Sequence, residues 1–136
     1  MKTVYVDFET RSEVDLPARG AWAYAEHEST DVLCLVWAIG DGSPHLAIPF
    51  TYGDSLGNEV TPWEDTKKAF EEMVADPEYM FEAHNAFFER SIWHNVMHKR
   101  YGVVDIPQGR WRCSASVAAA HALPRPLGKV SKVLSV

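Results

Sequence analysis

The chain has 136 residues, of which 46% are hydrophobic and 24% are charged, and its formal net charge is −6. This composition indicates one soluble, globular domain with its own core. No apolar stretch approaches the roughly 20 residues of a membrane span, and no signal peptide is visible. The two cysteines, Cys34 and Cys113, have no CxxC spacing, which argues against a zinc site or a disulfide framework. We therefore expect a cytoplasmic protein.

The charges are distributed unevenly along the chain. All nineteen acidic residues lie at or before Asp105, whereas residues 106–136 carry five basic side chains and no acid. A basic segment on an acidic body can be a surface that faces phosphates. It can also be an ordinary solvated helix face. Charge alone therefore leaves nucleic-acid binding open.

The first half of the chain has the pattern of a sheet. Residues 3–9 alternate with β-branched and aromatic side chains. Residues 32–40 are apolar on both faces, as in the centre of a sheet, and Pro49 places the strand at 45–50 toward an edge. The remaining segments are predicted as loop at residues 11–20, as a short strand or turn at 21–27 and as loop at 51–61.

In the second half, strands alternate with helices. A helix is expected over 61–76, where Thr61, Pro62 and Glu64 form a capping box. Further helices are expected over residues 86–102, 114–123 and from 127 onward, and strands over 79–85 and 110–114. This order predicts a mixed sheet flanked by helices, in an α/β or α+β domain.

Two acids stand at the end of the first predicted strand. Asp7 and Glu9 share one strand face because side chains alternate with a period of two. Two close carboxylates repel each other unless a cation neutralises them, and Mg²⁺ or Mn²⁺ is the usual cation for oxygen ligands. Most such pairs are nevertheless solvated strand ends, so the pair alone is weak support for a metal site.

The second polar stretch is "EAHNAFFER", residues 82–90. Here a strand ends at His84 and Asn85, a helix begins, and Glu89 lies one turn into it. One interpretation is structural, with Asn85 as the N-cap and Glu89 placed for the helix dipole. The other is functional, because the carboxyl ends of strands in α/β sheets gather ligands. If the two strands are neighbours, Glu89 becomes a third carboxylate at one site.

"DFET" followed by "HNAFFE" resembles the first two motifs of the DnaQ-like 3′–5′ exonucleases, which include the proofreading domains of family A DNA polymerases. "RWRCSASVAAAHALPR" resembles the segment after the second motif in phage-type polymerases of that family. The resemblance covers nearly the whole chain. It implies a ribonuclease H-like fold with a five-stranded mixed sheet flanked by helices, and hydrolysis of DNA from its 3′ end to nucleoside 5′-monophosphates with two Mg²⁺ or Mn²⁺ ions.

The resemblance also implies a role for individual residues. Asp7 would bridge both metal ions, Glu9 would hold one and orient the attacking water, and Glu89 stands where the family usually has an Asp ligand. The implied substrate-binding residues are Thr10, His84, Asn85 and Phe88. Candidate nucleic-acid contacts are Arg11, Arg110 and Arg112, the last two flanking Trp111, which is itself more often a core residue than a stacking platform.

The family's third motif, a Tyr or His followed by a final Asp, is not found, since no acid follows Asp105. The expectation is a single DnaQ-like domain over residues 1–136 that is incomplete at its C-terminus. Three explanations stay open: a part of a longer exonuclease or polymerase, a chain that gains the acid from a polymerase domain or a second chain, or a non-catalytic binder of nucleic acid or protein. The expected partners are single-stranded or frayed 3′ DNA ends, in a bacterial or phage-infected cell.

Overall fold

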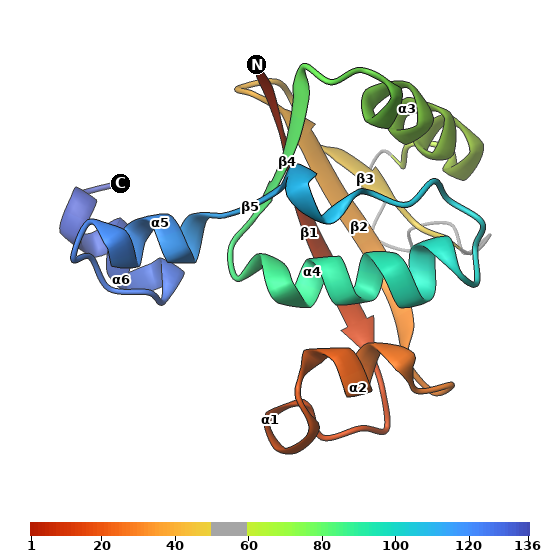
Figure 1. Cartoon of the computed structure of the whole chain (residues 1–136), viewed down its shortest axis with the longest axis horizontal. Helices are drawn as coiled ribbons and strands as arrows, with labels where there is room; N and C mark the ends of the chain where they lie inside the picture. The colour runs from red at the N-terminus through yellow and green to blue at the C-terminus, as the bar shows by residue number, and fades with distance from the viewer. Residues whose placement is uncertain (50–59) are drawn as a thin grey trace.

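The computed structural model describes residues 1–49 and 60–136, and the loop predicted at 51–61 lies almost entirely outside them. Its centre is a sheet with the strand order β3-β2-β1-β4-β5 (Figure 1). The five strands are β1 (Lys2–Arg11), β2 (Asp31–Ile39), β3 (His45–Ala47), β4 (Tyr79–Ala83) and β5 (Trp111–Cys113). All five predicted strands are confirmed, including the edge position of β3. The apolar strand β2 lies one place in from that edge rather than at the middle.

The sheet is mixed. β1 pairs antiparallel with β2, and β2 with β3, whereas β1 pairs parallel with β4, and β4 with β5. Each parallel connection contains a helix, as the geometry of parallel strands requires. The result is the expected α/β domain, and its five-stranded mixed sheet is consistent with the ribonuclease H-like fold.

One face of the sheet carries the core. The alternate β1 residues Val4, Val6 and Phe8 are buried and are covered by α3 (Trp63–Ala75), α4 (Ala86–Ile92) and η1 (Trp93–His98). Trp93 is fully buried, with its ring 4.5 Å from Phe70 and 5.9 Å from Phe8. The helix predicted over 86–102 is confirmed as α4 and η1, and η1 has the wider π-helical turn.

The opposite face of the sheet is more open. Tyr5 is 45% exposed, and Asp7 and Glu9 follow it on the same side of β1. The two last helices, α5 (Ser114–Ala120) and α6 (Leu127–Leu134), project beyond β5 at one side of the domain (Figure 1). No helix among the described residues is both long and apolar enough to cross a membrane.

Two predictions about local structure were wrong. Residues 11–27 are not loop and strand: they contain α1 (Leu16–Arg19) and α2 (Ala21–Glu26). The side chain of Asp15 accepts from the Ala18 N–H and begins α1, and Gly20, with φ 81°, separates the two helices. The alanines of "AWAYAE" favour a helix. The capping box at Thr61 is also absent, because Pro62 occupies the N-cap of α3 and no side chain caps it.

Candidate active site

The first half of the candidate site is the open side of β1. Asp7 and Glu9 are both exposed, and they pair across the sheet with Val36 and Cys34 of β2. The pairing register shifts between Glu9 and Thr10, and such irregularities re-aim side chains near the end of a strand. The prediction that both acids share one face is confirmed by this register.

Cys34 is a neighbour of this pair that the sequence did not single out. Burial is the largest cause that raises the pKa of its thiol, and the negative charges of Glu9 and Asp7 raise it further, while a backbone hydrogen bond from Glu9 opposes them. Since a thiol responds to both acids, their field is concentrated on one small area of the sheet.

The second half of the site is the turn from β4 into α4. Asn85 has a left-handed backbone with φ 69° and ψ 50°, which Asn tolerates better than most residues. It occupies the N-cap position, but its side chain makes no capping hydrogen bond. The predicted position is therefore confirmed, whereas the capping bond of the structural interpretation is absent.

The turn delivers Glu89 toward Asp7. The pairing of β1 with β4 ends at Tyr5 and Glu82, although β1 continues to Arg11. Beyond that point β1 has no β4 neighbour, and the first turn of α4 approaches it instead. The negative charge of Asp7 contributes, after burial, to the raised pKa of Glu89, which is consistent with the two motifs lying near each other.

Glu89 is the most unusual acid among the described residues. Its side chain is only 5% exposed, and its Oε2 atom is buried without a hydrogen-bond partner. Burial is the main cause that raises the pKa of Glu89 from 4.5 to about 7; its own backbone N–H lowers it, and the charge of Asp7 raises it again. A buried carboxylate with an unpaired oxygen is costly, and a proton or a cation relieves it.

A divalent cation fits this environment in its chemistry. Carboxylate oxygens are the ligands that Mg²⁺ and Mn²⁺ prefer, and Asp7 and Glu89 supply them from two elements, with Glu9 on the same face of β1. Within residues 1–49 and 60–136, no three His, Cys, Asp or Glu side chains are gathered closely enough to hold a metal ion. Asp7, Glu9 and Glu89 therefore do not form a closed three-ligand cluster in this structure.

Tyr24 of α2 connects the two halves of the site. Its hydroxyl lies 2.8 Å from the hydroxyl of Thr10, and its ring centroid lies 5.9 Å from that of Phe88, the residue before Glu89. Tyr24 is buried. Because residues 21–27 were predicted as strand or turn, this contact was missed; the alanine-rich helical spacing around Tyr24 was the signal that could have found it.

His84 holds the C-terminal helices against β4. Its Nδ1 lies 2.9 Å from the Ser114 hydroxyl, and its Nε2 lies 2.6 Å from the backbone carbonyl oxygen of Arg125. Both ring nitrogens are thus engaged within the protein. This role is structural and differs from the predicted contact with substrate.

The three predicted nucleic-acid contacts have different surroundings. The guanidinium of Arg110 donates to four backbone carbonyls, those of Met73, Val74, Asp76 and Tyr79. That network ties η2 (Gln108–Arg110) to the end of α3 and gives Arg110 a structural role. Arg11 lies 3.9 Å from Asp31 and stays largely exposed. Arg112 is exposed and reaches the sulfur of Met1.

Comparison with known proteins adds one relationship. No protein-family model matches the chain. The chain is 32% identical, over all of its 136 residues, to a protein named DNA polymerase from Bacillus phage SP02. It spans 18% of that protein's length. The α/β domain with its acidic site is therefore related to one segment of a phage DNA polymerase.

Proposed function

We propose that the chain is a 3′–5′ exonuclease module of the DnaQ-like type, which hydrolyses DNA from the 3′ end to nucleoside 5′-monophosphates. The observation that carries this proposal is the buried carboxyl of Glu89, whose Oε2 has no hydrogen-bond partner and whose pKa the charge of Asp7 helps to raise. Relationship to a phage DNA polymerase supports a substrate of DNA, and the mixed sheet is consistent with the fold of these exonucleases.

Asp7, Glu9 and Glu89 would hold the Mg²⁺ or Mn²⁺ ions. Bound there, the ions would lower the pKa of an attacking water and stabilise the charge of the leaving 3′ oxygen. Glu9, exposed on β1, would orient that water. Thr10 is fixed by the Tyr24 hydroxyl, and Asn85 has a side chain free of capping, so both can position the terminal nucleotide. A polymerase domain or a second chain would be the source of any further carboxylate.

The proposal is tested with 5′-labelled single-stranded DNA and Mn²⁺. A ladder shortened from the 3′ end is the expected product, and Asp7→Ala should abolish it. Asp41→Ala is a matched control, because Asp41 is an exposed acid in the turn after β2. If Asp7→Ala leaves the cutting unchanged, the proposed site is wrong.

A second candidate is a non-catalytic protein that binds nucleic acid or another protein through the same fold. The absence of a three-ligand cluster among the described residues favours it, as does the basic, acid-free segment 106–136. Calorimetric titration with Mn²⁺ separates the two functions. Tight binding of DNA without binding of Mn²⁺ would favour the non-catalytic protein.

A further inference from the structure

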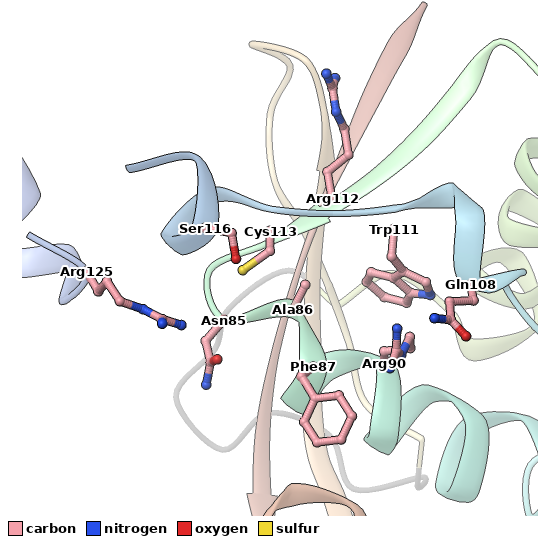
Figure 2. Close-up of a pocket in the computed structure, with 10 residues that line it drawn as sticks. All are labelled: Asn85, Ala86, Phe87, Arg90, Gln108, Trp111, Arg112, Cys113, Ser116 and Arg125. Carbon is pink, nitrogen blue, oxygen red and sulfur yellow. The ribbon is translucent and has the colours of Figure 1, made fainter. Parts of the chain in front are cut away.

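A pocket at the start of α4 contains neither Asp7 nor Glu89 in its lining. It has a volume of about 400 Å³ and lies between the start of α4, β5 and the connection from α5 to α6 (Figure 2). Its lining residues that matter here are Phe87 and Arg90 of α4, Trp111 and Cys113 of β5, and Arg125. Of the residues that the proposed exonuclease mechanism uses, Asn85 lines this pocket, whereas Asp7, Glu9 and Glu89 do not.

The pocket has two guanidinium groups that the rest of the protein does not use. The guanidinium of Arg90 lies 5.2 Å from the Phe87 ring. Neither Arg90 nor the Arg125 side chain makes an ion pair or a side-chain hydrogen bond with any described residue. In Figure 2 Arg125 enters from one end and Arg90 lies near the other, whereas Arg112 points away. The bond from His84 to the backbone of Arg125 fixes that end of the pocket.

No acid neutralises these cations inside the pocket, since its lining contains no Asp or Glu. The adjoining pocket shares Arg90 and contains Asp105. The carboxylate of Asp105 is already engaged, 2.7 Å from Nδ1 of His94. Glu89 precedes Arg90 in sequence but faces Asp7. With three guanidiniums, no carboxylate and one Cys113 thiol whose pKa is about 7, the lining has a net positive charge, which favours an anion.

We propose that this pocket binds the phosphate group of a nucleotide, through the guanidiniums of Arg90 and Arg125. Guanidinium groups match phosphate oxygens in charge and in hydrogen-bond geometry. Phe87 is 49% exposed and offers a ring face to a base. The volume lies at the lower end of the roughly 300–1,000 Å³ of small-ligand sites, which suits one nucleotide.

The phosphate can come from two sources. It is either a free nucleoside 5′-monophosphate or a phosphate within a single strand of DNA. Both carry the same group, and both would occupy the pocket without a metal. Binding measured without a metal therefore tests this proposal separately from metal-dependent cleavage, although the pocket adjoins the exonuclease site through Asn85.

Cys113 gives the pocket a chemical reporter. Burial alone would raise the pKa of its thiol, but hydrogen bonds from the Ser116 hydroxyl and from backbone N–H groups at Ala86, Ser116 and Asn85 lower it to about 7. A thiol with this pKa reacts quickly with iodoacetamide at neutral pH. The other thiol, Cys34, has a raised pKa and lies beside Glu9 on β2, so it serves as an internal reference.

The experiment uses the full chain in EDTA and titrates dTMP, inorganic phosphate and the oligonucleotides (dT)₂ to (dT)₈ by calorimetry. Arg90→Gln and Arg125→Gln should each weaken binding about 10-fold, the usual effect of losing a charge-assisted hydrogen bond. Arg112→Gln, which lines the same pocket with its charge turned away, should change binding less than about 2-fold. Saturating ligand should slow alkylation of Cys113 and leave Cys34 unchanged.

The titrations with dTMP and with the oligonucleotides identify the source of the phosphate. If dTMP binds as tightly as (dT)₈, the ligand is a free nucleotide; if affinity appears only with the longer oligonucleotides, it is a strand. Circular dichroism checks that each variant is folded. If Arg90→Gln is not folded, Arg90→Lys is used instead to test the role of the charge at this position. The proposal is overturned if neither dTMP nor the oligonucleotides bind, if Arg112→Gln weakens binding as much as Arg90→Gln, or if Cys113 is not protected.

Discussion

Glu89 and Arg90 are adjacent on α4, yet they face two regions of opposite character. On one side Glu89 is buried against the field of Asp7 with an unpaired oxygen. On the other side Arg90 and Arg125 enter a pocket that contains no acid. Among the described residues, neither Glu89 nor Arg90 forms an ion pair.

This contrast shows how one short helix can serve two kinds of ligand. A charged side chain with a structural role finds its hydrogen-bond partners within the protein, as Arg110 does with four backbone carbonyls. Charges left without a partner in a concave or buried place depend on something from outside. Under the two proposals, the acidic side would take a cation and the basic side an anion, and a DNA end with its bound metal would supply both.

The largest expected effect distinguishes the structural Arg110 from the exposed Arg112. Arg110→Ala should lower the free energy of unfolding by about 3 kcal/mol, because four backbone carbonyls lose a charged donor. Arg112→Ala should stay within about 0.5 kcal/mol, as is usual for an exposed side chain. Urea denaturation measures both values. Equal losses in the two variants would contradict the division of the basic segment into structural and free cations.

The next effect isolates the acidic side. Asp7→Asn keeps the shape of the side chain and removes one ligand charge, so affinity for Mn²⁺ should fall about 100-fold. Binding of dTMP in EDTA should not change, since Asp7 does not line the pocket that contains Arg90 and Arg125. Calorimetry of both ligands on one preparation provides the control. Loss of dTMP binding in Asp7→Asn would mean that the two regions are one site.

The pKa of Glu89 makes stability depend on pH. The folded protein holds this proton up to about pH 7, whereas the unfolded chain releases it near pH 4.5. Since the folded state binds more protons, stability is present below pH 4.5 and is lost as pH rises through 7. Glu89→Gln removes that loss and should raise the melting temperature by about 4 °C at pH 8 without metal. Near pH 4.5 the two proteins should melt alike; an equal difference at both pH values would argue against a buried ionisable Glu89.

The smallest expected effect concerns the link between the motifs. Tyr24→Phe removes the hydroxyl at Thr10 and keeps the ring against Phe88, so it should destabilise the protein by about 1 kcal/mol. Tyr24→Leu loses the ring as well and should destabilise the protein more than Tyr24→Phe does. Thermal melts of both variants test this order of destabilisation. If Tyr24→Phe destabilises the protein more than Tyr24→Leu, the described contacts of Tyr24 with Thr10 and Phe88 are wrong.

The sequence predicted the features that depend on local patterns. Alternation along residues 3–9 predicted β1 and the shared face of Asp7 and Glu9, and the strand end at His84 predicted the turn before Glu89. These features follow from side-chain periodicity, which can be read directly from the sequence. The ring contacts around Trp93 do not, since they join α3, η1 and β1 across distant parts of the chain.

The errors have physical causes as well. Residues 21–27 alternate as a strand would, but most of them form a helix. Burial of this helix against α4 outweighs the strand-like pattern. Arg110 looked like a free cation because its four carbonyl partners come from α3 and β4, which no local pattern identifies. Arg125 and Cys113 gave no signal for the same reason: only the fold places them beside Arg90.

The most direct test of the central claim is a calorimetric titration of the full chain with Mn²⁺ between pH 5.5 and 8. A proton must leave Glu89 before a cation can bind there, so affinity should rise with pH and level off above about 7. Glu89→Gln should abolish this rise and weaken binding at every pH. If Mn²⁺ does not bind, or binds Glu89→Gln as tightly as the wild type, then Asp7 and Glu89 do not form a cation site.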